Sequence, residues 1–347
     1  QGDYTASREN LEQALSLAHQ AERPDLEAQV LRNFGTICRR LGEGEKAKDY
    51  LKQALQTCRR LEDRSGESAA LHMLGTVAFT QGDYAGALDL YGQAVKIRRE
   101  IGERRTEIST LNNLGVLQAM LGHYAEARAH YRQCLEIGRE MQDQAAELRA
   151  LVNLSEAARQ LGEYEQARDD GEHAARLAQE IGNRSLHATA LINLGHALTG
   201  LQQWDEATAA YQHAVDIRSE LEEQHLAIEA RAGLARVALL QDEISQAQAH
   251  VAAVLAYLDG EGSVSGMEDP FQVYLICYRV LQAASEPRAA QILEWAFDTL
   301  RAHVSKINPD ARRSFLENVP AHRELVQSYA HDQGTKAPAI VASLVAS

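Results

Sequence analysis

Side-chain amides recur at multiples of forty residues along this sequence. Asn33, Asn113, Asn153 and Asn193 each stand two residues after a leucine in four similar segments. An amide both donates and accepts hydrogen bonds, so a row of amides on one surface could hold the backbone of an extended peptide. Each amide could equally hydrogen-bond to a neighbouring helix or face solvent. The residues alone leave both interpretations open.

Guanidinium groups accompany the amides at related positions. They stand in a chain with 49 acidic and 35 basic residues and a formal net charge of −14. This local reversal of sign would suit an acidic peptide, a carboxylate or a phosphate. Solvated charges, or pairing with acids of adjacent helices, would also explain it. The arginines concerned are Arg32, Arg39, Arg40, Arg149, Arg159 and Arg236.

The candidate binding residues follow one positional rule. They lie two residues before the first leucine of a segment, or one, two or five residues after it, and some arginines lie a turn further on. The full set is Gln29, Arg32, Asn33, Thr36, Arg40, His72, Thr76, Asn112, Asn113, Arg149, Asn153, Glu156, Arg159, Asn193, His196 and Arg236.

These positions belong to a repeat that is clearest over residues 71–100. The sequence LHMLGTVAFTQGDYAGALDLYGQAVKIRRE returns forty residues later at 111–140 and again at 151–180, without gaps. Leucine and alanine recur at helical spacing before and after Gly82, which predicts two amphipathic helices joined by a glycine turn. The small residues Gly75, Ala87 and Ala94 would let the two backbones approach closely.

The pattern resembles the tetratricopeptide repeat: L-x2-L-G at Leu71, Leu74 and Gly75, an aromatic residue at Tyr84, and alanine and tyrosine at Ala87 and Tyr91. The period is forty rather than thirty-four, and the usual helix-ending proline is absent. The longer period is similar to that of sensors in bacterial signal-transduction ATPases, including the maltose-regulon activator. The resemblance implies an all-α fold, a right-handed superhelix with the first helices along a concave groove.

The repeat divides the chain. Residues 1–20 match the second helix of a truncated repeat, so we expect more protein upstream. Residues 21–259 hold six repeats, at roughly 26–60, 66–100, 106–140, 146–180, 186–220 and 226–259. After the flexible sequence GEGSVSG, residues 260–331 read as a helical pair and capping helices. Residues 332–347 lack helical periodicity and predict a loose or weakly docked tail.

Composition and motifs exclude several classes of function. The negative charge argues against nucleic acid or an anionic membrane as the partner, and no apolar run could span a bilayer. The cysteines are not closely spaced, which indicates core residues in a reducing cytoplasm. GEGEKA at Gly42 lies between two helices, so it predicts a turn rather than a dinucleotide loop. Without catalytic, phosphate-binding or metal-ligand motifs, we expect no enzyme, cofactor or metal.

The sequence therefore predicts a non-catalytic module that binds a protein, an acidic peptide or a small inducer in its concave groove. The resemblance implies the sensor region of a larger bacterial regulator, coupled to an upstream effector domain of the same chain. One alternative is a constitutive scaffold that self-assembles through exposed repeat ends. Another is a peptide-pheromone-type receptor, which requires the asparagines to face an open groove.

Overall fold

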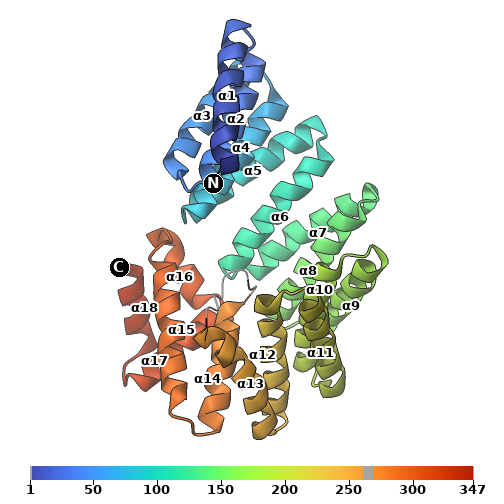
Figure 1. Ribbon diagram of the computed structural model, residues 1–347, viewed down its shortest axis with the longest axis vertical. Coiled ribbons are helices and arrows are strands. Elements are labelled where there is room, and N and C mark those ends of the chain that lie inside the picture. The colour runs from blue at the N-terminus through green and yellow to red at the C-terminus, as the bar shows by residue number, and fades with distance from the viewer. Residues whose placement is uncertain (1, 261–266, 268, 347) are drawn as a thin grey trace. The chain divides into compact units, whose positions relative to one another are not determined.

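The computed structural model describes residues 2–260, 267 and 269–346, and all regular structure in these residues is helical (Figure 1). The predictions of an all-α chain and of paired helices are thus confirmed. The helices are α1 (Gly2–Gln20), α2 (Pro24–Arg40), α3 (Gly44–Arg60), α4 (Arg64–Thr80), α5 (Tyr84–Ile101), α6 (Arg104–Met120), α7 (Tyr124–Glu140), α8 (Gln144–Gln160), α9 (Tyr164–Glu180), α10 (Arg184–Gly200), α11 (Trp204–Glu220), α12 (Gln224–Leu240), α13 (Ile244–Asp259), α14 (Pro270–Ala283), α15 (Arg288–Val304), α16 (Pro309–Glu317), α17 (Pro320–Asp332) and α18 (Ala337–Ala346).

The chain forms two compact units. Unit 1 comprises residues 1–117 and 306–311, and unit 2 comprises residues 118–305 and 312–347. The division falls inside α6. Each unit has its own candidate binding positions, so the two are described separately below.

The turns between helices repeat at half the period of the sequence. Every twentieth residue from 22 to 242 has a positive φ angle, between 52° at Glu22 and 77° at Gly42. At Gly42, the amide of the following Glu43 donates to Cys38 O at 2.8 Å, as in a Schellman motif. Glycine adopts this backbone conformation without strain, whereas Gln202 and Asp242 pay a steric cost. The turns predicted at Gly42 and Gly82 are confirmed, and the same turn forms at Gln202 and Asp242, where glycine is absent.

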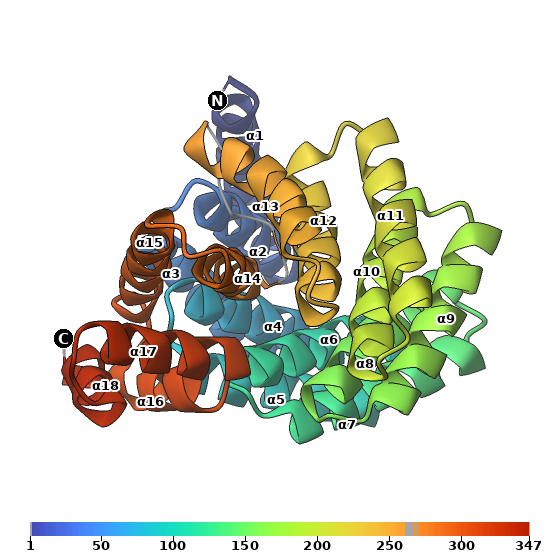
Figure 2. The ribbon, with the colours of Figure 1, turned by 90° about the horizontal axis from the view of Figure 1, so that it is seen from below.

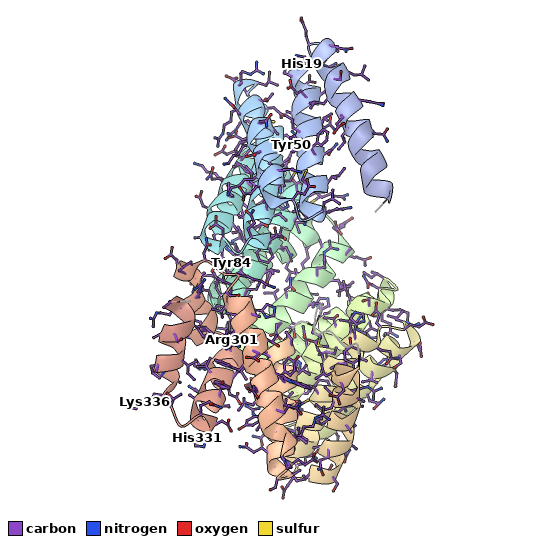
Figure 3. All side chains as sticks on the ribbon, turned by 60° about the vertical axis from the view of Figure 1, so that its left-hand side comes forward. His19, Tyr50, Tyr84, Arg301, His331 and Lys336 are labelled. Carbon is purple, nitrogen blue, oxygen red and sulfur yellow. The ribbon has the colours of Figure 1, made fainter. Side chains whose placement is uncertain are left out.

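A tyrosine ring fills the space that glycine leaves between helices in unit 2. Tyr211 of α11 is fully buried. A Cβ atom added to Gly195 of α10 would lie 2.6 Å from Cε1 of Tyr211. A Cβ atom added to Gly233 of α12 would lie 2.4 Å from the same atom. The ring therefore packs directly on two neighbouring helix backbones. In unit 1, Tyr50 of α3 (Figure 3) stacks on Phe34 of α2 with ring centroids 5.0 Å apart.

Buried acids fix the start of some first helices. Glu107, in the first turn of α6, has no exposed side-chain surface. Its carboxylate accepts from Arg99 Nε at 2.6 Å and from Arg104 Nη1 at 2.8 Å. Glu67 holds the same place in α4 and also pairs with two arginines. An acid at a helix N-terminus additionally meets the positive end of the helix dipole.

First helices form one layer in each unit. In unit 1, α2 packs on α4, and in unit 2, α8, α10, α12 and α14 pack side by side in that order (Figure 2). The second helices α9, α11 and α13 pack against their partners. All four cysteines are free and buried, which confirms their interpretation as core residues.

The C-terminal residues differ from the expected loose tail. Residues Ala337–Ala346 form α18, which packs on α17 and α15 and buries Val341 and Leu344. Arg312 Nη1 of α16 donates to Val345 O at 3.1 Å. The helix contains no charged side chain and is apolar, so its order depends on packing rather than on an amphipathic pattern. Of the GEGSVSG sequence, residues 261–266 lie outside the described part of the chain.

Candidate functional site

The four asparagines of the repeating row occupy different environments. Asn33 on α2 is exposed and Asn153 on α8 is half-buried. Asn113 Nδ2 donates to Tyr91 Oη at 3.4 Å. Asn193 is 2% exposed, and its Nδ2 donates to Val152 O of α8 at 3.2 Å. Asn193 is thus buried in a hydrogen-bonded link between α8 and α10 rather than on an open surface. The receptor alternative requires the asparagines to face an open groove. Asn193 does not, and Asn113 is bonded to Tyr91.

In unit 1, α2 carries the exposed candidates. Gln29, Asn33 and Arg40 are exposed, whereas Arg32 is half-buried and its Nη1 donates to Cys58 Sγ at 3.5 Å. Thr36 donates to the carbonyl of Arg32 at 3.2 Å, so its hydroxyl is bonded within its own helix. The polar surface of α2 can therefore contact a partner.

The candidates on α4 form an internal network instead. His72 Nδ1 lies 2.9 Å from Thr110 Oγ1, and burial lowers the pKa of His72 to about 4. Thr76 Oγ1 donates to the His72 carbonyl at 3.0 Å and accepts from Tyr91 Oη at 3.1 Å. Asn112 on α6 is half-buried. These hydrogen bonds hold the repeat together, so His72 and Thr76 are structural.

In unit 2, the polar candidates of α8 form a charged pair. Arg149 is exposed. Arg159 Nε donates to Glu156 Oε2 at 2.7 Å, and its Nη2 donates to Oε1 at 2.5 Å. Although burial opposes the charge, Glu156 raises the pKa of Arg159 above its ordinary value. The fork geometry of this contact commits Arg159 to Glu156 and reduces its freedom to bind an added acid.

Asp269, just before α14, completes this charged group. Its Oδ2 lies 3.9 Å from Arg159 Nη2, its Oδ1 accepts from Gln272 N at 3.1 Å, and its own amide donates to Glu229 Oε1 at 2.8 Å. Burial raises the pKa of Asp269, and Glu156 adds to this effect. A residue from outside the repeats therefore supplies a carboxyl group to the surface of α8 and α12.

The sequence contained two signals for this contact that were not recognised. Asp269 precedes Pro270, which is the arrangement of an N-cap residue before a first-turn proline. Glu229 stands two residues before Arg231, at the place that Gln29 and Arg149 occupy in their repeats. Their meeting could not be read from the repeat because it depends on where the chain returns after α13.

His196 and Tyr211 lie close enough to Arg159 of the charged group to interact with it electrostatically. Tyr211 Oη and His196 Nδ1 are 2.6 Å apart, and Thr199 Oγ1 lies 3.4 Å from the same Oη. Burial holds the pKa of His196 well below its usual value, and Arg159 and Arg236 lower it further. His196 is therefore neutral at physiological pH. Burial also raises the pKa of Tyr211 to about 12.

Arg236 on α12 is half-buried and has no ion pair or hydrogen bond among the described residues. Its electrostatic neighbours are Tyr211, Arg159 and Arg279, and burial lowers its pKa. Arg279 is already paired with Glu324. We call the surface formed by Arg159, His196, Arg236 and Asp269 the inner site. Within it, Arg236 is the cation that lacks a carboxylate.

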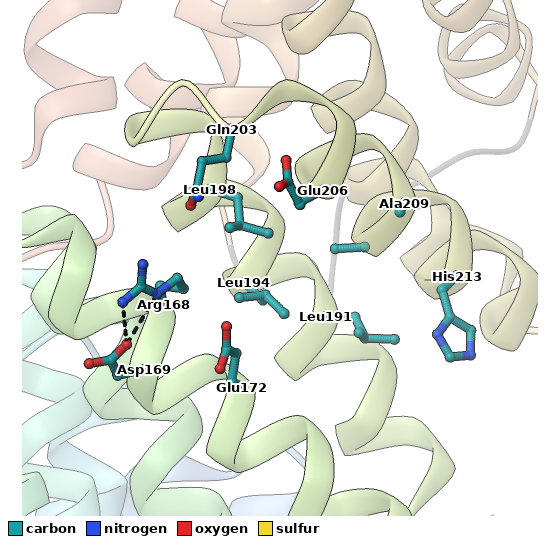
Figure 4. Close-up of a pocket in the computed structure, with 11 residues that line it drawn as sticks. Arg168, Asp169, Glu172, Leu191, Leu194, Leu198, Gln203, Glu206, Ala209 and His213 are labelled. Carbon is teal, nitrogen blue, oxygen red and sulfur yellow. Dashed lines mark hydrogen bonds and ion pairs between the residues drawn. The ribbon is translucent and has the colours of Figure 1, made fainter.

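Unit 2 also contains a pocket that the sequence did not predict. A cavity of about 610 Å³ lies between the second helices α9 and α11, above α10 (Figure 4). Its floor consists of Leu191, Leu194 and Leu198, and its sides carry Arg168, Asp169, Glu172, Glu206 and other polar residues. We call it the outer pocket. The repeat pattern gave no signal for it because its lining residues come from three helices.

The family model of the tetratricopeptide repeat matches residues 1–60, 26–100, 66–140, 146–220 and 186–259. These matches cover most of the chain and follow the forty-residue register. The chain belongs to the tetratricopeptide repeat family.

Solved structures share the tetratricopeptide repeat fold at low sequence identity, and no curated protein matches the sequence. The signal transduction ATPase with numerous domains from Pyrococcus horikoshii, which has a tetratricopeptide repeat sensor, is 19% identical with a TM-score of 0.62, over 74% of this chain and 40% of that chain. The apo form of RapI is 15% identical with a TM-score of 0.59, over 99% and 94%. A Rap protein complexed with competence and sporulation factor is 14% identical with a TM-score of 0.53, over 97% and 99%.

The tetratricopeptide repeat fold is typically a scaffold for protein interactions rather than for catalysis. Across the described residues, no three histidine, cysteine, aspartate or glutamate side chains gather as metal ligands. Nor does any helix there have the length and apolar character needed to cross a bilayer. At the inner site, the guanidinium of Arg236 can bind an anion by charge and hydrogen bonding, whereas His196 and Tyr211 are bonded to each other.

Proposed function

We propose that this chain is a non-catalytic binding module whose inner site holds an acidic segment of a protein or peptide, or a small inducer bearing a carboxylate or phosphate. The observation that carries the proposal is Arg236, a half-buried guanidinium without an acidic partner in the described chain. The bound anion would complete the charge pairing that the protein itself leaves open.

Arg236 carries a charge that the described chain does not pair. Removing a cation from water without a compensating partner is unfavourable, and burial accordingly lowers the pKa of Arg236. The two nearby carboxylates, Glu156 and Asp269, already lie against Arg159. Neither forms an ion pair with Arg236. A carboxylate beside Arg236 would form a charge-assisted hydrogen bond in a partly dehydrated setting, where such bonds are strong.

The larger role follows from the relatives. We propose that the module is the sensor region of a bacterial signalling regulator, in which ligand binding changes the contacts of a helix layer and thereby an attached effector domain. The tetratricopeptide repeat sensor of the Pyrococcus ATPase and the Rap complex with competence and sporulation factor support this role by similarity of fold.

Ligand-dependent thermal stability tests the inner site. We would measure the melting temperature with citrate, with inorganic phosphate and with an acetylated peptide of alternating aspartate and alanine. Arg236→Gln should abolish the rise in melting temperature that the anions produce. Arg231→Gln is the matched control, because Arg231 lies on the same helix and its charge acts on His250 instead.

Two results would contradict the proposal. In the first, no anion raises the melting temperature of the wild type above that given by equal ionic strength of sodium chloride. In the second, Arg236→Gln and Arg231→Gln reduce the rise equally, which would indicate general screening of charge rather than binding.

A further inference from the structure

The outer pocket exposes an apolar surface that the other repeats cover. Leu194, on its floor, is only partly buried, whereas the leucines at the same repeat position are all buried. Those are Leu74, Leu114, Leu154 and Leu234. An apolar side chain left accessible in one repeat, inside a cavity of about 610 Å³, is a site where a partner could bury surface.

A substitution in α9 accounts for the difference. Gly171 stands where Tyr91, Tyr131 and Tyr211 stand in their own repeats. A Cβ atom at residue 171 would lie 3.3 Å from the Cα of Leu194, so the α9 backbone approaches α10 closely there. With no ring at this place, α9 covers α10 with less side-chain surface. Glycine in place of tyrosine at residue 171 thus leaves the leucine floor of the pocket open to a partner.

The sides of the pocket carry three acids, Asp169, Glu172 and Glu206, and one arginine, Arg168. Asp169 is paired with Arg168 at 2.7 Å, and Glu172 lies 3.7 Å from Arg176. Glu206 makes no ion pair or hydrogen bond with any described residue. Figure 4 shows Glu172 on α9 and Glu206 on α11, with the leucines between them. A partner must therefore place cations on both sides of an apolar stripe.

One polar group of the pocket also lacks a partner. The Oε1 atom of Gln203, which lines the pocket, is buried and accepts no hydrogen bond from the described chain. An unsatisfied buried acceptor is unfavourable. A donor on a molecule bound in the pocket could satisfy this oxygen.

We propose that the outer pocket binds a basic amphipathic helix of a partner protein. The pocket runs along α11 from Gln203 to His213, which is about 15 Å at the rise of an α-helix and matches roughly three turns of a bound helix. The leucine floor would receive apolar residues at positions i, i+3 or i+4, and i+7. Lysine or arginine residues beside that stripe would face Glu172 and Glu206. This site is separate from the inner site, and its charge preference is opposite.

Fluorescence anisotropy with a synthetic helix tests this inference. The probe is a fluorescein-labelled peptide of leucine and lysine, about 14 residues long, with leucines at helical spacing. In the second peptide, glutamate replaces every lysine. The wild-type chain should bind the lysine peptide saturably and should bind the glutamate peptide at least about tenfold more weakly.

The variants locate the binding. Glu172→Lys with Glu206→Lys should weaken lysine-peptide binding about tenfold at constant ionic strength. The control, Glu165→Lys with Asp205→Lys, makes the same change of charge on the same two helices at exposed residues outside the pocket lining, and should change affinity by less than about twofold. Circular dichroism of both variants checks that the fold is retained.

The inference would be overturned by no saturable binding of the lysine peptide, by equal binding of the glutamate peptide, or by equal loss in the pocket and control variants. Arg236→Gln separates this inference from the proposed function. It removes the inner-site cation and should leave lysine-peptide binding unchanged, whichever result the anion experiment gives. A loss of lysine-peptide binding in Arg236→Gln would place that binding at the inner site and overturn the inference.

Discussion

Replacing Gly195 with alanine tests the packing that positions the inner site. The added Cβ atom would lie 2.6 Å from Cε1 of Tyr211, whose hydroxyl meets His196. Overpacking of this kind costs about 1–3 kcal/mol of unfolding free energy. Alanine also gains about 1 kcal/mol over glycine in a helix interior. The expected net loss for Gly195→Ala is therefore about 1 kcal/mol.

A double-mutant cycle isolates the contact between the two residues. In a Tyr211→Leu background the ring is gone, so Gly195→Ala should become stabilising by roughly 0.5–1 kcal/mol through helix propensity alone. The coupling free energy should then be about 2 kcal/mol. Gly92→Ala is the control for sign, because Gly92 is an exposed glycine inside α5 with no atom within 4 Å of an added Cβ. It should stabilise.

Urea unfolding followed by far-ultraviolet circular dichroism gives the required free energies. A coupling below about 0.5 kcal/mol would refute the reasoning, because that is the range found for residues that do not touch. The reasoning would also be refuted if Gly195→Ala increased the unfolding free energy as much as Gly92→Ala does. Either result would mean that the ring of Tyr211 does not press on the backbone of α10.

Three further predictions concern pH, capping and buried charge. Burial lowers the pKa of His322 from 6.5 to about 4, so the unfolding free energy should fall as the pH drops from 6.5 towards 4. His322→Gln should flatten this pH dependence in urea unfolding. An unchanged pH dependence would contradict the prediction. Asp269→Ala should lower the unfolding free energy by about 1 kcal/mol through loss of the α14 N-cap. Asp269→Asn should lower it less, because asparagine can also cap a helix. Equal losses for the two variants in thermal unfolding would argue against capping. Arg99→Ala combined with Arg104→Ala should destabilise more than Glu107→Ala in the same assay, because the double change leaves the buried carboxylate without these two cations, whereas Glu107→Ala leaves only two exposed guanidinium groups; the reverse order would contradict the network.

The sequence alone determined the local structure of this protein. The forty-residue register and the leucine and alanine spacing specify paired helices, because hydrophobic periodicity reflects which face of a helix is buried. The turn positions followed as well, even at Gln202 and Asp242, because the register places the turn regardless of the residue. These properties depend on residues close together in the chain.

Only the tertiary structure decided which residues of the repeating row can meet a ligand. Asn33 and Asn193 hold the same repeat position, yet one is exposed and the other is bonded to Val152 of the adjacent helix. Accessibility depends on what the neighbouring helix places opposite each side chain, and a repeat pattern does not encode that. For the same reason, the approach of Asp269 to Arg159 and the opening of the outer pocket appear only once the helices are packed.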